Sequence, residues 1–384
     1  MLASGCSDGA TFAQRPGFAR WFAAHPPDPA RPGAADRQRL RAHRPVLRVP
    51  EGAPGPLRFY RDYIGAGTLR VDGRRFDDVD RARLAAHARD PGARFAHRPA
   101  TAPEPRAVGY GRVDRAALPP FGRLTFLTWH FVFRRSGLPA ELPPWQSLTA
   151  ATFGDRDDWH QLDHYTAATL VLGPREVPLA LILQQHNNLR SYWYGRDLAL
   201  ADDGRPRLVA ALRSNELYPW RGQRRRHRVV RFPAPDNLRW LATGAGERPW
   251  TASHDLTRAG DRVDYALRFL PQTDPFYRFR GRLGASRLLP GRDGPPGADY
   301  NTLPAFKDRR LQLCALRWTG RADTARLDML ERLLADPDDP LARQRLFDQC
   351  RAFIRARLAA ATATGTQASI GYNAAAASQG PSRP

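Results

Sequence analysis

The stretch DDWHQLDHYTAATLVLGPREVPLALILQQHNN, residues 157–188, contains the clearest structural pattern in the chain. Its residues 165–172 are aromatic, β-branched or small and apolar, which predicts a strand. The sequence Gly-Pro-Arg-Glu at 173–176 is a turn signal, and residues 177–183 form a second apolar run. Two strand-length runs joined by four residues predict an antiparallel hairpin.

Polar residues flank both strands at the open end of this hairpin. If Leu172 pairs with Val177, His186 lies opposite Asp163. His160 precedes Asp163 by three residues, so it lies near the same open end. Two imidazoles and a carboxylate are suitable ligands for zinc or another divalent metal. The same groups are suited to general acid and base catalysis. The structural alternative is a polar cluster that satisfies strand ends by hydrogen bonding.

Four further residues could support this site. His164 and Tyr165 follow Asp163 directly, and Ser214 and Asn215 follow a predicted strand at 207–212. A hydrolase would need a nucleophile, for which Ser214 is the candidate. The chain has no Gly-x-Ser-x-Gly elbow around it. We therefore keep a ligand or metal site as the first hypothesis, and a hydrolase that uses His160, Asp163 and His186 as the alternative.

Short strands separated by turns extend over most of the chain. Residues 124–133 are almost all aromatic, aliphatic or Thr, which predicts a strand covered on both faces. An edge strand is expected within 45–50, and a half-exposed strand at 263–269. With 35 prolines and 31 glycines, this pattern predicts a mainly β fold, an antiparallel β-sandwich of residues 46–318.

The two ends of the chain differ from this central part. Residues 1–45 predict an irregular arm with a short helix near 36–43. Leucines at helical spacing predict a helical hairpin at 319–362 that packs on the sandwich. Residues 363–384 contain few apolar side chains and are expected to be disordered.

The formal net charge is +22, and all but one of the 60 basic residues are arginines, the exception being Lys307. This imbalance indicates codon bias in a GC-rich genome, so nucleic acid is not the expected partner. The basic residues concentrate only at 221–228, which reads RGQRRRHR. We interpret this run as a solvated loop after a strand. The alternative is an anion- or nucleic-acid-binding surface formed by Arg224, Arg225, Arg226 and Arg228.

The first residues suggest a cellular location. Cys6 follows Leu-Ala-Ser-Gly, which resembles the cleavage box of bacterial lipoproteins. If the true start lies upstream, Cys6 becomes the lipidated N-terminus and the protein is attached to the membrane on the periplasmic side of the cell envelope. A chance cysteine in an ordinary N-terminus would leave the protein cytoplasmic. The other cysteines, Cys314 and Cys350, are expected to be buried thiols, the alternative being a disulfide between them.

The motif order within residues 108–219 resembles that of the vacuolar protein sorting-associated protein 62 family, and more distantly the secreted necrosis-inducing proteins. The matching motifs are the aromatic strand 129–133, His160-x-x-Asp163, His186 and the segment 207–219. In those families a His-x-x-Asp-Trp-Glu box implies a divalent-cation site, and the necrosis-inducing proteins act on membrane sphingolipids. Here His164 replaces the Trp, Tyr165 the Glu, and Asn215 a later histidine. With Tyr165 in place of the carboxylate, the resemblance implies a β-sandwich more than the activity or a hard-cation site. The expected ligand is a small molecule, a glycan or a lipid, with its identity left open.

Overall fold

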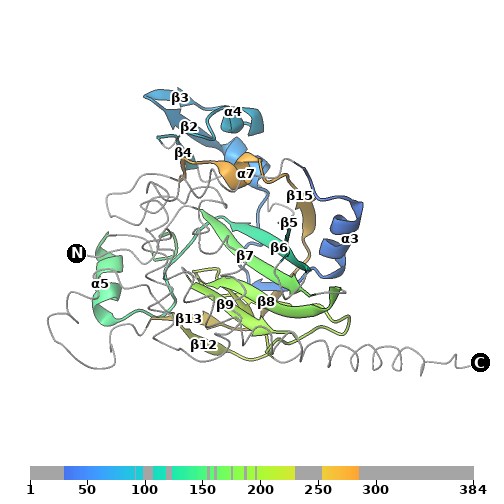
Figure 1. The fold of residues 1–384 in the computed structure, drawn as a ribbon. Coiled ribbons are helices and arrows are strands. Elements are labelled where there is room, and N and C mark those ends of the chain that lie inside the picture. The colour runs from blue at the N-terminus through green and yellow to red at the C-terminus, as the bar shows by residue number, and fades with distance from the viewer. Residues whose placement is uncertain are drawn as a thin grey trace, which may run out of the picture.

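The computed structural model describes residues 30–90, 92–97, 107–117, 123–153, 156–159, 162–173, 176–185, 188–194, 197–229 and 253–284. They form mostly strands, in several mixed sheets, with few helices (Figure 1). The mainly β prediction is confirmed, although the strand pairs β1–β10, β5–β15 and β4–β16 run parallel. The predicted helical hairpin 319–362, the tail 363–384 and all three cysteines lie outside the described residues.

The largest sheet has six strands in the order β15-β5-β6-β7-β8-β9. Their bounds are Ala266–Phe269, Val108–Ala117, Arg123–Phe133, Asp163–Leu172, Pro178–Gln185 and Asn188–Trp193. The predicted strand at 124–133 is therefore β6, and its residues Phe126 to Phe133 are buried on both faces. This confirms that the uninterrupted apolar run marks a central strand.

The predicted hairpin is β7 and β8, but its predicted register is wrong by two residues. Ala168 pairs with Leu183, whereas the expected pairing would place it opposite Leu181. The register shifts between Val171 and Leu172, and Leu172 meets Pro178 instead of Val177. Five residues, 173–177, separate the two strands, and the Gly173 N–H closes the turn by bonding to the Val177 carbonyl. A bulge of this kind cannot be read from an apolar pattern.

A second sheet has four strands in the order β11-β10-β1-β14, with bounds Leu217–Pro219, Arg207–Ala210, Val46–Pro50 and Gly260–Val263. β1 was expected at an edge, but it lies between β10 and β14. Its side chains Leu47 and Val49 are buried. One core cluster contains these residues together with Leu127, Trp129 and other residues of the six-stranded sheet.

The predicted strand 263–269 is two strands in two different sheets. β14 ends at Val263 in the four-stranded sheet, and β15 begins at Ala266 in the six-stranded sheet. Between them the buried Tyr265 donates a hydrogen bond of 2.7 Å to the Pro45 carbonyl. The chain changes sheet at this anchored tyrosine.

Helix α3 (Ala34–Ala42) confirms the helix expected near 36–43 and belongs to the core. Leu40 is buried, and its carbonyl accepts a hydrogen bond from the Trp129 indole. The end of the predicted arm is thus built into the fold.

A further layer lies above the six-stranded sheet in Figure 1. Its sheet has the order β16-β4-β2-β3, with bounds Arg282–Leu283, Arg94–His97, Gly67–Val71 and Arg74–Phe76. A π-helical turn (Phe59–Tyr63), a 3-10 turn (Ile64–Ala66), α4 (Arg81–Ala86) and α7 (Pro275–Arg278) accompany it. These elements share a core cluster with Tyr110 and Val132 of the six-stranded sheet.

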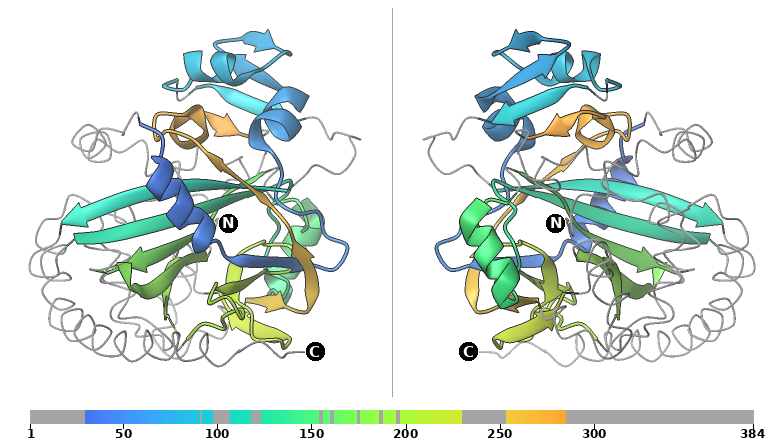
Figure 2. Two further views of the ribbon diagram at one scale, coloured as in Figure 1. Left: turned by 90° about the vertical axis from the view of Figure 1, so that its right-hand side faces the viewer. Right: turned by 90° about the vertical axis from the view of Figure 1, so that its left-hand side faces the viewer.

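A two-stranded ribbon and a helix complete the described fold on the opposite side (Figure 2). The ribbon consists of β12 (Arg225–Arg228) and β13 (His254–Thr257), and the helix is α5 (Pro144–Phe153). The basic run 221–228 was expected to be a loop, but half of it forms β12. In the described part of the chain, no helix has the length and apolar character needed to cross a bilayer.

Candidate functional site

The described part of the predicted site is one end of the six-stranded sheet, where β7 begins. β7 begins at Asp163, opposite Phe133 of β6, and the antiparallel neighbour β8 ends at Gln185. In an antiparallel pair, one strand begins at the end of the sheet where its neighbour ends. The start of β7 at residue 163 and the end of β8 therefore lie at the same end of the sheet. His160 and His186 are outside the described residues, and Asp163, His164 and Tyr165 are placed only as positions along β7.

This end of the sheet is attached firmly to the four-stranded sheet. The buried Gln185 amide donates to the Leu217 carbonyl at 2.7 Å and to the Tyr192 hydroxyl at 3.0 Å. Leu162 and Thr166, on either side of the start of β7, are fully buried. The start of β7 and the end of β8 are therefore held by buried neighbours, which is the kind of support that a binding site requires.

The supporting residues Ser214 and Asn215 lie in the turn between β10 and β11. Asn215 has a φ of 57°, and its side-chain amide donates to the Arg135 carbonyl at 2.6 Å. Arg213, with a φ of 70°, forms an ion pair of 2.8 Å with Asp157. The turn thus contacts the stretch 157–188, but through Asp157, a residue for which the sequence predicted no role.

Ser214 bonds to a partner that the sequence did not indicate. Its hydroxyl donates to Asp255 of β13 at 2.7 Å, and the Tyr218 hydroxyl donates to the other carboxylate oxygen at 2.8 Å. Ser214 is 2% exposed and Asp255 is 0% exposed. The hydroxyl is therefore shielded from substrate, and its geometry gives no support to Ser214 as a nucleophile.

His227 and Thr257 extend the same network, and we call these five residues the Asp255 cluster: Ser214, Tyr218, His227, Asp255 and Thr257. The His227 ring stacks on Tyr218 with centroids 3.8 Å apart, and its Nε2 lies 2.9 Å from the Thr257 hydroxyl. The cluster joins the ribbon β12–β13 to the outer face of the four-stranded sheet. Its buried hydrogen bonds fix the ribbon in place.

The four arginines of the predicted anion site differ in their surroundings. Arg226 is exposed, but its Nε donates a hydrogen bond of 2.7 Å to the Glu141 carboxylate. The Arg226 guanidinium also lies 3.3 Å from His254 Nδ1. Arg224 and Arg225 are exposed, and neither guanidinium forms a hydrogen bond or an ion pair with another described residue. Arg228 is placed only by its backbone pairing with His254.

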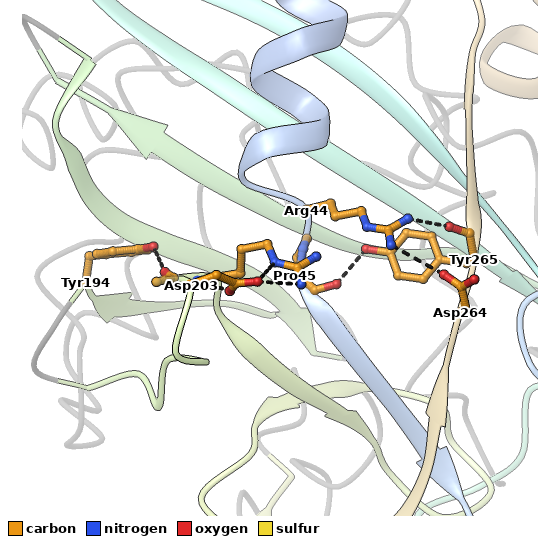
Figure 3. Close-up of polar contacts among 8 residues, drawn as sticks. Arg44, Pro45, Tyr194, Asp203, Asp264 and Tyr265 are labelled. Carbon is orange, nitrogen blue, oxygen red and sulfur yellow. Dashed lines mark hydrogen bonds and ion pairs between the residues drawn. The ribbon is translucent and has the colours of Figure 1, made fainter. Parts of the chain in front are cut away.

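Two further polar networks hold the layers together. In Figure 3 the Arg44 guanidinium donates to the Tyr265 carbonyl at 2.9 Å and approaches the Asp264 carboxylate at 3.3 Å. Burial raises the pKa of Tyr265 well above its usual range. On the same side of the molecule, hydrogen bonds from Arg205 lower the pKa of Asp203.

The second network is centred on Asp274, whose carboxylate is buried. It accepts hydrogen bonds from the Tyr60 hydroxyl, from the Phe276 N–H at 2.9 Å and from Arg81 Nε at 2.8 Å. Burial, followed by the charge of Asp274, raises the pKa of Tyr60. Both networks connect distant segments of the chain and thereby stabilise the fold.

Among the residues that the structure describes, no three His, Cys, Asp or Glu side chains are placed to hold a metal ion. The predicted set is not covered by this finding, since His160 and His186 lie outside those residues. Comparison with family models, with curated proteins and with solved structures found no match for the chain.

Proposed function

We propose that this chain is a ligand-binding β-sandwich protein of the bacterial cell envelope. Its site would lie at the edge of the six-stranded sheet, with His160, Asp163 and His186 as the binding residues. The observation that carries this proposal is the end of the sheet that both strands share: β7 starts at Asp163, and β8 ends at Gln185. In the register that pairs Ala168 with Leu183, Gln185 is level with Thr166, three residues along β7 from Asp163. Strand ends are positions where the backbone leaves the ladder and polar side chains can converge on a ligand.

The sandwich is supported by the core that two sheets have in common. Leu127, Trp129 and Leu170 from one sheet pack in the same cluster as Leu47 and Leu208 from the other. Facing sheets with interdigitated apolar side chains define that architecture. The resemblance to the vacuolar protein sorting-associated protein 62 family agrees with it.

The ligand proposed is a divalent metal, which would serve to hold a small-molecule, glycan or lipid group. Two histidines and one aspartate form a donor set that favours zinc over calcium or magnesium. The hydrolase alternative is less well supported, since the nucleophile candidate Ser214 is buried against Asp255. A metal- or base-activated water would be its remaining route.

The envelope location depends on Cys6, which lies outside the described residues. Lipidation there would attach the chain to the membrane on the periplasmic side. Genomic sequence upstream of Met1 tests this part separately. An apolar signal segment in frame supports it, and an immediate in-frame stop contradicts it.

Zinc titration by calorimetry tests the site. The full chain should bind one zinc ion, and H160A, D163A and H186A should each reduce affinity by on the order of tenfold or more, because each removes a ligand. H87A is the matched control, since His87 follows α4 and its ring packs against Phe76 of β3. Equal binding by H186A and H87A would contradict the proposal.

A further inference from the structure

A cluster of exposed arginines lies at the tip of the ribbon β12–β13. Arg225 pairs with Thr257 in the last rung of the ladder. The same register places Arg224 level with Arg258, which follows β13 directly. Arg224, Arg225 and Arg258 are all exposed. We call these three residues the ribbon tip.

The ribbon tip has no charge compensation in the described part of the chain. None of its three arginines forms an ion pair or hydrogen bond with a described side chain, in contrast to Arg226, which is neutralised by Glu141. The nearby Arg221 is also exposed, and it donates to a main-chain oxygen, the carbonyl of Asp197, at 2.6 Å. Like charges facing one another across a strand pair are destabilising unless an anion lies between them.

The tip is held on a rigid support. Asp255 and Thr257 of the ribbon belong to the buried Asp255 cluster, and His227 stacks on Tyr218 of the four-stranded sheet. The arginines therefore project from a fixed position, and little backbone ordering is needed when they bind a partner.

One apolar side chain is exposed on an element linked to this ribbon. Leu148 of α5 is 70% exposed, and no other large hydrophobic side chain is exposed among the described residues. α5 begins three residues after Glu141, whose backbone pairs with His254 of β13. Figures 1 and 2 show α5 and the ribbon on the same side of the molecule.

We propose that the ribbon tip docks the protein on an anionic phospholipid surface, with Arg224, Arg225 and Arg258 on lipid phosphates and Leu148 inserted at the interface. Guanidinium groups bind phosphate oxygens in pairs of hydrogen bonds. A basic surface combined with an exposed apolar side chain is the usual composition of a peripheral membrane contact. Single-stranded nucleic acid fits less well, because it needs exposed aromatic platforms, and the described residues offer none here.

Vesicle co-sedimentation of the full chain tests the proposal. Wild-type protein should bind vesicles of phosphatidylcholine with about a third phosphatidylglycerol, and not pure phosphatidylcholine. Each surface arginine contributes roughly fivefold to the partition coefficient, so R224Q/R225Q/R258Q should lower it by on the order of a hundredfold. L148S should lower it by roughly tenfold.

The matched control removes three other exposed arginines, in R61Q/R70Q/R74Q. These residues lie in the layer on the opposite side of the six-stranded sheet. Both triple variants lose the same net charge, so a surface-wide attraction would weaken both equally. An equal loss would overturn the proposal, as would binding of wild-type protein to a DNA duplex but not to anionic vesicles. The test does not depend on the His160, Asp163 and His186 site.

Discussion

The hydroxyl of Ser214 and the carboxylate of Asp255 are joined by a hydrogen bond of 2.7 Å that is almost completely shielded from solvent. The two residues lie 41 positions apart: Ser214 is in the turn between β10 and β11, and Asp255 is in strand β13 of the ribbon. Because Tyr218 donates to the other carboxylate oxygen, the aspartate links the turn after β10, the strand β11 and the ribbon. The serine acts as a structural donor here.

Replacing this serine should therefore affect stability and leave binding unchanged. A hydrogen bond to a charged group contributes about 1.5–3 kcal/mol, so S214A should lower the free energy of unfolding by that amount in urea denaturation. S147A, a helix position in α5, should change it by less than about 0.5 kcal/mol. Zinc binding should be equal in all three proteins. Loss of zinc binding in S214A would assign the serine to the site.

Stability should fall steeply above pH 10. Burial raises the pKa of Tyr60, Tyr110 and Tyr265 above the unfolded value of about 10. Unfolding therefore releases protons in this range, so the stabilisation is complete below pH 10 and is lost as pH rises toward the folded-state pKa. Each such tyrosine contributes about 1.4 kcal/mol per pH unit.

Y265F isolates one of these contributions. Between pH 10.5 and 11.5, approximate bounds set by the unfolded tyrosine pKa, its unfolding free energy should depend less steeply on pH than that of wild type. At pH 7 the variant should lose roughly 1 kcal/mol, since the Pro45 carbonyl loses its donor. An identical slope for both proteins would mean that Tyr265 ionises in the folded state.

Asp274 should be among the most sensitive positions in the fold. D274A removes the acceptor for the Tyr60 hydroxyl and the Phe276 N–H and leaves Arg81 unpaired. The expected loss is at least about 2 kcal/mol, because buried donors are left unsatisfied. D274N keeps one acceptor oxygen and should lose less. In urea denaturation the midpoint should be lowest for D274A, intermediate for D274N and highest for wild type. A reversed order would contradict this prediction.

Gly260 should not tolerate a side chain. A Cβ added there would lie 1.9 Å from the Val49 carbonyl oxygen in the neighbouring strand β1. G260A must therefore separate β1 from β14 and should destabilise the protein by about 1–3 kcal/mol. Calorimetric unfolding measures the effect, and an unchanged melting temperature would show that β14 can move without cost.

The sequence predicted the elements that have a clear period and missed the contacts between distant segments. The apolar run of β6 and the β7–β8 hairpin were identified because both faces of a central strand must be apolar. The register was missed, since a bulge at Leu172 leaves no mark on an apolar pattern. The break between β14 and β15 was missed because Tyr265 continues the alternation while its hydroxyl anchors a change of sheet.

For the candidate site, the sequence predicted which strands approach each other but not which groups bond. Asp255 was overlooked because its partners are distant in sequence: Ser214 lies in the turn after β10, and Tyr218 lies in β11. The alternation of Asp255 and Thr257 in β13 was the one signal available, and it indicates only that both share a face. The arginine run was predicted to be a loop because consecutive charged side chains indicate exposure to solvent. A strand can nevertheless pair when only one of its faces is buried.

X-ray absorption at the zinc edge of the zinc-loaded chain tests the central claim, a metal site formed by His160, Asp163 and His186. The account predicts nitrogen and oxygen ligands at about 2.0–2.1 Å, with an outer-shell signal from two imidazoles. In H186A the bound zinc should decrease and the imidazole signal should fall to one ring. Sulfur ligands at about 2.3 Å, or the spectrum of the hydrated ion, would contradict the claim.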